Sequence, residues 1–361
     1  MAGAKRAAVC RIRSVILNVE QAEPMFGKRA RSGKNARSLS TFLFALLLTI
    51  AVGASAAAQS TPDASNASLS LFEPLTALPD APARSDGPLK IVASTGIIGD
   101  LVDQIGGSRV EVTTILPANA DPHEFEPSPK DVATLQDAKV VFIHGLGLDN
   151  WAQDLIDNSG ADFAVVTVTD GVETVNRLGG DGEDVDPHVW FDPTKVAQMA
   201  ANIAAGLSAA DPEGADAYNA RLAVYQQNLA ALDQQIADRI ALIPADRRNI
   251  VTNHDALGYF ADRYGLNIVG TVIPGLSPGV EPSAQEVAAL LQTVKDQHVS
   301  VIFAENTVSP KLAEQLASEA GITVVDTLYS DSLGEAGSGA DTYIGLMQTD
   351  TQAIVSALMN P

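Results

Sequence analysis

The chain has 361 residues, 46% of them hydrophobic. That is enough for two hydrophobic cores, because a single core stops growing near roughly 250–300 residues. Its formal net charge is −21. So acidic a surface repels nucleic acid and anionic lipid, which excludes both as partners, and it attracts cations only diffusely, without selectivity.

The first 58 residues are predicted to be a secretory signal peptide. A basic block at 28–37 precedes an apolar run from Leu39 to Val52, and small residues follow at 53–58. The apolar run is about 14 residues long, shorter than the roughly 20 that a transmembrane helix needs. An uncleaved membrane anchor is the alternative. Met25 is an alternative start, because the residues before it add nothing that a signal needs.

Cleavage near Ala58 would leave a strongly acidic protein without cysteine. The first 58 residues hold nine basic and two acidic side chains, so 14 basic and 42 acidic ones remain, a net charge of −28. The only cysteine, Cys10, leaves with the signal, and with it any disulfide, thiolate ligand or lipid-attachment site. We therefore expect a free periplasmic protein with no membrane span in its mature form.

Residues 59–88 are rich in Ser, Ala, Asp and Pro and are expected to form a disordered linker. An N-terminal lobe is predicted over 89–210. Its strands are expected at the apolar runs 89–94, 110–116, 138–143 and 163–168. Helical patterns separate these runs, and strands that alternate with helices are typical of parallel βαβ units.

One long helix is predicted over 211–243. Asp211 is a candidate N-cap, with Pro212 in the first turn. Apolar residues recur at spacings of three and four between Leu222 and Ile240. A helix of about 30 residues would be roughly 45 Å long, more than one small lobe needs. It is therefore either a spine that joins two lobes or an ordinary surface helix.

The alternation of strands and helices resumes in a C-terminal lobe over 244–361. Strands are expected at 248–252, 268–272, 299–304 and 322–326, and helices at 283–295, 310–320 and 342–359. The sequence therefore predicts an α/β protein of two lobes, each built on a mostly parallel sheet flanked by helices.

Three of the five histidines lie where predicted strands run into loops. His123 and His188 each end an Asp-Pro-His tripeptide, and His254 ends Ile-Val-Thr-Asn-His. Ligands of parallel α/β sheets bind beyond the carboxyl ends of the strands. Asp331, which follows the last predicted strand, is the best-placed carboxylate. Three imidazoles and one carboxylate suit a four-coordinate divalent ion, most naturally zinc.

Three of these four candidate ligands have an alternative interpretation. His188 could be part of a surface turn, and His254 a hydrogen-bonded loop histidine. Asp326 and Glu305 are rivals of Asp331 for the carboxylate position.

Other polar side chains are candidates to support the ligands. Glu305 directly follows Val-Ile-Phe-Ala and suits a position behind a ligand or at a hinge. Asp121 and Asp186 fit either as turn formers before proline or as partners for an imidazole N–H group.

Four further residues near these motifs have structural interpretations. His144 is expected to pack at a strand end, and His298 is expected to be solvated. Trp190 and Phe125, which lie beside the proposed ligands in sequence, are expected to shield the site from water.

Several stretches of 89–361 resemble one family of bacterial transport proteins. They are Asp-Pro-His-Glu-Phe-Glu-Pro-Ser-Pro at 121–129, Gly-Leu-Gly-Leu-Asp-Asn-Trp at 145–151, Asp-Pro-His-Val-Trp-Phe-Asp-Pro at 186–193, Asn-His-Asp-Ala-Leu-Gly-Tyr-Phe at 253–260, Glu-Pro-Ser at 281–283 and Tyr-Ser-Asp at 329–331. The chain resembles the cluster A-I solute-binding proteins of zinc and manganese ABC importers, also called solute-binding protein family 9. The resemblance implies two similar lobes joined by one long rigid helix, with metal bound in the interlobe cleft and delivered to a membrane permease.

The choice between zinc and manganese follows from comparing three positions of this chain with members of the family. Zinc members often carry a long His-rich loop before the second histidine ligand, whereas 179–186 is short and acidic here. His144 stands where relatives commonly have Asn. Manganese members often have Glu at the third ligand position, where this chain has His254. Because imidazole favours the softer, tetrahedral ion, zinc is predicted, with manganese as the alternative.

The expected role is metal capture. The resemblance implies that His123 and His188 come from the N-terminal lobe, and that His254 and Asp331 come from the C-terminal lobe. Four protein ligands leave no open coordination position for a reactive water. Metal affinity should fall as the pH drops through the histidine range, near about 6–7. The stiff helix implies that lobe motions are small.

Two other classes of function have weaker support. A metal-dependent hydrolase could use His123, His188 and Asp331 with Glu305 as the base, but the sequence contains no His-Glu-x-x-His helix. An adhesin is suggested only by analogy with relatives. We therefore expect a monomeric binding protein rather than an enzyme, with a divalent ion and an inner-membrane permease as partners.

Overall fold

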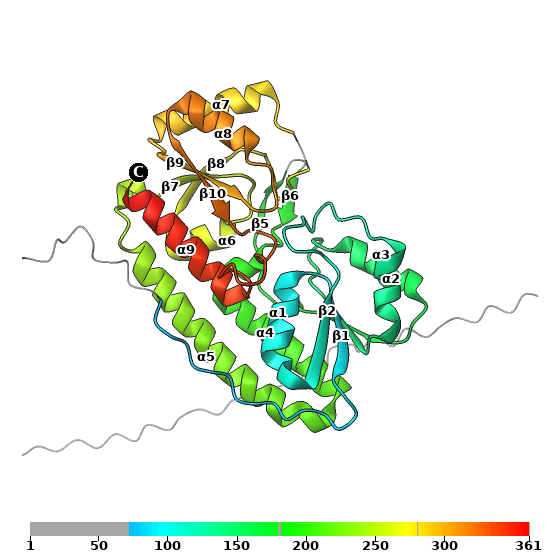
Figure 1. Cartoon of the computed structure of the whole chain (residues 1–361). Coiled ribbons are helices and arrows are strands. Elements are labelled where there is room, and N and C mark those ends of the chain that lie inside the picture. The colour runs from blue at the N-terminus through cyan, green and yellow to red at the C-terminus, as the bar shows by residue number, and fades with distance from the viewer. Residues whose placement is uncertain (1–71, 180–181, 280, 361) are drawn as a thin grey trace, which may run out of the picture. The chain divides into compact units, whose positions relative to one another are not determined.

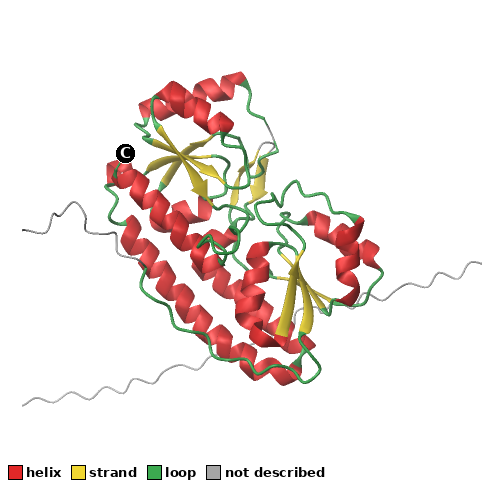
Figure 2. Ribbon diagram, viewed as in Figure 1, coloured by secondary structure: helices red, strands yellow, loops and turns green. Residues whose placement is uncertain are grey.

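The computed structural model describes residues 72–179, 182–279 and 281–360. The expected signal peptide at 1–58 and the first part of the expected linker, 59–71, lie outside the described residues. Within the described parts, helices cover two four-stranded parallel sheets, and a small antiparallel pair of strands lies apart from them (Figure 2). None of the helices in these parts is both long and apolar enough to span a bilayer.

The N-terminal sheet has the strand order β2-β1-β3-β4, and every neighbouring pair is parallel. Its strands are β1 (Leu89–Ala93), β2 (Val110–Thr114), β3 (Val140–Ile143) and β4 (Ala164–Thr167). The helices of this lobe are α1 (Gly96–Gly106), α2 (Pro129–Thr134), α3 (Asn150–Ser159) and α4 (Pro193–Ala210). The hydroxyl of Thr95 caps α1, accepting from the backbone N–H of Ile98 at 3.4 Å.

The C-terminal sheet has the order β10-β9-β7-β8, again with all pairs parallel. Its strands are β7 (Asn249–Thr252), β8 (Asn267–Thr271), β9 (Val301–Glu305) and β10 (Thr323–Leu328), and its helices are α6 (Gly258–Tyr264), α7 (Ala284–Asp296), α8 (Lys311–Ala320) and α9 (Tyr343–Met359). Counted from the first strand of each sheet, both sheets have the order 2-1-3-4. The prediction of two similar α/β lobes is therefore confirmed.

Helix α5 (Ala215–Ile240) belongs to both lobes. Its 26 residues give a length of about 39 Å at 1.5 Å per residue. It packs against α1 and α4 of the N-terminal lobe and against α6 and α9 of the C-terminal lobe (Figure 1). Tyr225, Leu229, Leu232 and Ile236 are buried along one face, at the predicted spacing. The prediction of one long helix that joins the lobes is confirmed.

Helix α5 begins later than predicted. Residues Pro212–Gly214 form a single 3-10 turn before it. The side chain of Asp211 makes no capping hydrogen bond to this turn. Its carboxylate instead forms ion pairs with Arg84 at 2.6 Å and with Arg109 at 2.8 Å. A buried carboxylate needs such partners, and this need outweighs its value as a helix cap.

The segment 72–88, which we call the N-terminal strap, follows a defined path along α5. The backbone N–H of Thr76 donates to Asn228 at 2.9 Å, and the amide of Asn228 donates back to the carbonyl of Thr76 at 2.8 Å. The backbone N–H of Glu73 donates to Gln235 at 2.8 Å. The prediction of a disordered linker is therefore wrong over 72–88. Polar side chains of α5 satisfy the backbone of a segment that forms neither helix nor strand.

A hairpin of β5 (Asn176–Gly179) and β6 (Gly182–Val185) is a second departure from the sequence analysis. The sequence analysis treated 179–186 only as a short acidic segment. The hairpin returns the chain to Asp186, whose backbone N–H donates to the carbonyl of Val175 at 3.0 Å. It therefore fixes the start of the second Asp-Pro-His motif.

Candidate metal centre

Four side chains converge from loops at the carboxyl ends of strands. His123 follows β2, His188 follows the hairpin strand β6, His254 follows β7, and Asp331 follows β10. The ligand atoms of these four residues all lie within 4.8 Å of one another. The structure thus brings together the four residues that the sequence analysis proposed as ligands, two from each lobe.

The separations of the ligand atoms have the scale of a metal coordination shell. The Nε2 atoms of His123 and His188 are 3.3 Å apart. Oδ1 of Asp331 lies 3.5 Å from Nε2 of His188, and Oδ2 of Asp331 lies 3.4 Å from Nε2 of His254. A tetrahedral zinc ion with ligands at about 2.0–2.1 Å places neighbouring ligand atoms about 3.3–3.4 Å apart. These three separations agree with that spacing, although the two distances from Asp331 are measured from different oxygens, and the four ligand atoms as a set lie within 4.8 Å of one another.

The centre is buried, and two of its ligand atoms have no hydrogen-bond partner in the part of the chain that the structure describes. The side chains of His188 and His254 have no exposed surface. Among the described residues, no hydrogen-bond partner is found for Nε2 of His254 or Oδ1 of Asp331. Because unpaired buried polar atoms destabilise a fold, such atoms call for a ligand. A dication placed between them would satisfy both, so the donor set fits a divalent metal.

Two aspartates hold the histidines of the N-terminal lobe. Oδ1 of Asp186 lies 2.7 Å from Nδ1 of His188 and accepts the backbone N–H of His188 at 2.9 Å. Asp121 accepts the backbone N–H of His123 at 2.8 Å. A carboxylate on Nδ1 fixes the tautomer in which the lone pair of Nε2 faces the centre. Asp186 therefore supports the imidazole of His188, whereas the hydrogen bond of Asp121 is to the backbone of His123, as expected of a turn former.

Glu305 holds the histidine of the C-terminal lobe. Its Oε2 lies 2.5 Å from Nδ1 of His254, and its Oε1 accepts the backbone N–H groups of Asn253 and His254, both at 3.1 Å. Glu305 therefore lies behind His254, whereas Asp331 faces the other ligands. The side chain of the second rival, Asp326, lies outside the described residues.

Burial and neighbouring charges set the protonation of the three imidazoles. Burial lowers the pKa of His123 and of His188 to about 3, although Asp331 opposes this shift. Burial also disfavours the charged form of His254, but Glu305 and Asp331 outweigh it and raise the pKa of His254 to about 10. At neutral pH two imidazoles are therefore neutral, and the third carries a proton that a metal ion must displace.

Two aromatic residues were expected to shield the site. The ring of Trp190 contacts His188 with centroids 5.2 Å apart, and its indole N–H donates to the carbonyl of Ser330 at 2.9 Å. Phe125 packs edge-on against Trp151 with centroids 4.8 Å apart. Trp190 thus covers one ligand directly and contacts both lobes, whereas Phe125 packs within the N-terminal lobe.

The two remaining histidines take no part in the cluster. His144 is buried at the end of β3, with its Nε2 2.8 Å from the carbonyl oxygen of Pro187. Because a carbonyl only accepts, this nitrogen carries the proton. His298 is exposed. The expectations of a packed His144 and a solvated His298 are both confirmed.

Two side chains behind His188 were not predicted from the sequence. Nε of Arg177 lies 2.7 Å from Oδ2 of Asp186, and the hydroxyl of Tyr259 donates to the backbone carbonyl of Asp186 at 2.9 Å. Arg177 lies in the hairpin, which no periodicity marked. Tyr259 belongs to the motif at 253–260, the one signal that could have identified it.

Residues 91–357 match a family model described as the periplasmic component A of the zinc-uptake complex. The match covers well over half of the chain. The chain belongs to this family. Members of this family of metal-importer proteins are solute-binding proteins, so the protein is a binding protein and not an enzyme.

Curated relatives in this family are named for metal import. The chain is 35% identical over 280 residues to the manganese-binding lipoprotein MntA of Halalkalibacterium halodurans, covering 77% of this chain and 92% of that protein. It is 29% identical over 282 residues to the manganese ABC transporter substrate-binding lipoprotein PsaA of Streptococcus pneumoniae, covering 76% and 90%. The family member described here is therefore an extracytoplasmic substrate-binding protein of a metal ABC importer.

Solved structures of the family share the fold. The periplasmic zinc-binding protein TroA of Treponema pallidum is 28% identical, with a TM-score of 0.70 over 75% of this chain and 99% of that one. A manganese-bound periplasmic metal-binding protein of Candidatus Liberibacter asiaticus is 27% identical, with a TM-score of 0.67 over the same shares. The fold therefore occurs in proteins named for zinc and in proteins bound to manganese.

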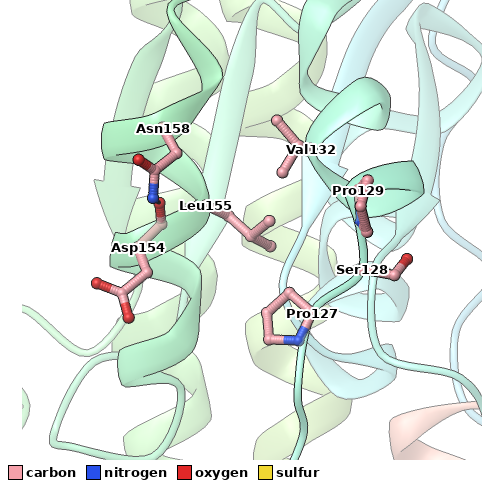
Figure 3. Close-up of a pocket in the computed structure, with 7 residues that line it drawn as sticks. All are labelled: Pro127, Ser128, Pro129, Val132, Asp154, Leu155 and Asn158. Carbon is pink, nitrogen blue, oxygen red and sulfur yellow. Dashed lines mark hydrogen bonds between the residues drawn. The ribbon is translucent and has the colours of Figure 1, made fainter.

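An open groove of about 430 Å³ lies away from this centre, between α2 and α3. Its lining residues are Pro127, Ser128, Pro129, Val132, Asp154, Leu155 and Asn158. In Figure 3, Leu155 of α3 points across the groove toward the segment that carries the two prolines. The lining has no histidine and only one carboxylate, so we assign no metal to it.

Proposed function

We propose that the protein captures a zinc ion with His123, His188, His254 and Asp331 and delivers it to the permease of an ABC importer. The observation that carries this proposal is the convergence of four ligand atoms from both lobes within 4.8 Å. Four protein ligands complete a tetrahedral shell, as in sites that hold a metal without using it in catalysis. The family to which the chain belongs supports the delivery step.

The donor atoms favour zinc over manganese. Imidazole nitrogen suits zinc, whereas carboxylate and carbonyl oxygens suit manganese, and three of the four candidate ligands are imidazoles. Three of the separations between ligand atoms, 3.3–3.5 Å, fit a small tetrahedral shell. Manganese is the alternative, because relatives are named for it and because the two oxygens of Asp331 face different histidines, which would allow a larger shell.

Competition between the two ions tests this choice. Metal-free protein titrated with Zn²⁺ and with Mn²⁺ in a calorimeter should bind one ion of either kind, with zinc at least about a hundredfold tighter. Because zinc binds most such sites more tightly than manganese, elemental analysis of protein from its native envelope completes the test. Manganese as the main bound ion there would establish the alternative.

Removal of one ligand tests the site itself. His254→Ala leaves three ligands and should abolish tight zinc binding in the same calorimetric titration. His298→Ala is the matched control, because it removes an exposed histidine outside the cluster and should leave affinity and stoichiometry unchanged. Unchanged affinity in His254→Ala would reject the proposed site.

We further propose that the mature protein begins near residue 59 and is a free monomer. The relatives named above are lipoproteins, but in this sequence the only cysteine, Cys10, precedes the apolar run at 39–52. The mass of the protein from its native envelope tests cleavage and lipidation together, and sedimentation tests the monomer. An added lipid mass, or partition of the protein into detergent, would contradict the free form.

A further inference from the structure

A chain of polar contacts behind His188 crosses from one lobe to the other. Nδ1 of His188 lies 2.7 Å from Oδ1 of Asp186, and Oδ2 of Asp186 lies 2.7 Å from Nε of Arg177. On its other side, Nη2 of Arg177 lies 2.7 Å from Oδ2 of Asp262 in α6. One guanidinium group therefore joins the carboxylate behind a candidate ligand to a helix of the C-terminal lobe.

The surface of α6 is shaped to receive this guanidinium. The hydroxyl of Tyr259 accepts the backbone N–H of Val175 at 3.1 Å and donates to the carbonyl of Asp186 at 2.9 Å. Arg177 also lies over the ring of Tyr259, 5.8 Å from its centroid. A Cβ atom added at Gly258 would lie 2.2 Å from Nε of Arg177, so any larger residue there would displace the guanidinium from this position.

Charge and geometry explain why an arginine occupies this position. The side chain of Asp186 is fully buried, and a buried carboxylate is stable only when it is paired and hydrogen-bonded. Arg177, with only 20% of its side chain exposed, is the only lysine or arginine among the described residues that forms an ion pair with Asp186. The planar guanidinium can contact two carboxylates at once, which the single ammonium of lysine does less well.

We propose that Arg177 is a positioning residue for metal binding, which clasps the hairpin to α6 and so holds His188 against the two ligands of the C-terminal lobe. This inference rests on the proposed function. For the metal to leave, the ligands of the two lobes must separate, and separation breaks the contact between Arg177 and Asp262. Arg177 therefore slows metal release.

The rate of zinc dissociation tests this role. Zinc-loaded full-length protein is mixed rapidly with excess chelator, and release is followed for the parent and for Arg177→Gln. Loss of a group that orients a metal ligand commonly weakens binding 10–100-fold, so we expect release at least about tenfold faster. Arg84→Gln is the matched control. Like Arg177, Arg84 is mostly buried, with 22% of its side chain exposed, and it pairs with a buried aspartate, Asp211. Neither Arg84 nor Asp211 is close in sequence to a candidate metal ligand. The release rate of Arg84→Gln should stay within about twofold of the parent.

A second variant moves Arg177 without changing any charge. Gly258→Ala places a methyl group against the guanidinium and should displace it from Asp186. Zinc release should then be faster than in the parent, as in Arg177→Gln. Combined with Arg177→Gln, it should add nothing. The visible absorption of the Co²⁺-loaded protein should also shift in both variants, because the imidazole of His188 is no longer held in place.

The outcomes separate the two proposals. If the parent protein binds no zinc, the proposed function fails. If the parent binds zinc but Arg177→Gln and Gly258→Ala both release it at the parental rate, the clasp alone is overturned. Equally fast release from Arg84→Gln would also overturn it, because the effect would then be general destabilisation.

Discussion

The histidine ligands of the two lobes receive different support from their carboxylates. Asp186, behind His188, shares its charge with Arg177. Glu305, behind His254, forms no ion pair with a lysine or arginine among the described residues, so no cationic side chain offsets the charge that it places beside the imidazole. His254 is therefore the strongest electron donor of the set, and its partner carboxylate should influence metal affinity most directly.

Replacement of this carboxylate tests its contribution. Glu305→Gln keeps the shape of the side chain but removes the charge behind His254. Zinc affinity, corrected for the proton that His254 must release, should fall about 10–100-fold because the imidazole becomes a weaker donor. Glu314→Gln in α8 is the control, since Glu314 is exposed and lies outside the cluster. Calorimetric titration measures both, and equal affinities for Glu305→Gln and the parent would contradict this prediction.

The protonation of His254 predicts how affinity depends on pH. Because its pKa is raised to about 10, the metal-free centre holds a proton that zinc must displace at all lower pH values. The pKa values of His123 and His188 are about 3, so these imidazoles are already neutral above pH 5. Affinity should therefore rise about tenfold per pH unit between pH 7 and 9 and level off near 10. The sequence analysis placed this dependence lower, near the ordinary histidine range, because burial beside two carboxylates is not visible in the sequence.

Calorimetry in buffers of different ionisation enthalpy measures this proton directly. The parent should release about one proton per zinc at pH 8, because only the protonated His254 must give one up. Release of no proton at pH 8 would show that His254 is already neutral in the metal-free protein. Glu305→Gln should release less than the parent, since Glu305 is the first of the two carboxylates that raise this pKa.

At the scale of elements, the strands and most helices were predictable because burial imposes a period on the sequence. The apolar spacing of α5 and the short runs of β1 and β7 are direct consequences of one-sided or two-sided burial. The hairpin β5–β6 and the strap have no such period. Both are held by polar contacts with residues that are distant in the sequence. In the hairpin, Arg177 contacts Asp262, 85 positions away. In the strap, Thr76 contacts Asn228, 152 positions away.

The contribution of the strap can be measured at one of these contacts. Asn228→Ala removes both hydrogen bonds to Thr76, and each such bond contributes about 0.5–1.5 kcal/mol, so the free energy of unfolding should fall by about 1–3 kcal/mol. Gln234→Ala is the control on the same helix, because Gln234 is exposed and its amide donates to the neighbouring Asp238 instead of to the strap. Urea unfolding compares the two, and zinc affinity should be unchanged in both. A stability equal to that of the control would mean that the strap contributes nothing.

At the scale of the whole molecule, as far as the structure describes it, the two lobes share an apolar core as well as the candidate metal centre. One continuous apolar core includes Phe142 of the N-terminal lobe, Leu232 of α5 and Phe303 of the C-terminal lobe. Across the centre, the backbone N–H of Asn119 donates to the hydroxyl of Ser332 at 2.8 Å. The sequence showed the ligands, since rare histidines at strand ends mark a site in any parallel α/β fold. It could not show these interlobe contacts, which depend on how two separate sheets pack on one helix.

A shared core with a spine of about 39 Å limits how far the lobes can separate when the metal leaves. We expect the radius of gyration from small-angle scattering to differ by less than about 1 Å between zinc-loaded and metal-free protein. Ala231→Pro tests the cause, because proline on the exposed face of α5 breaks the helix and should enlarge the difference. Ala231→Gly controls for helix propensity and should behave like the parent. A change of several ångströms in the parent would show that α5 bends, and metal release would then proceed by hinge opening instead of local loosening of the ligand loops.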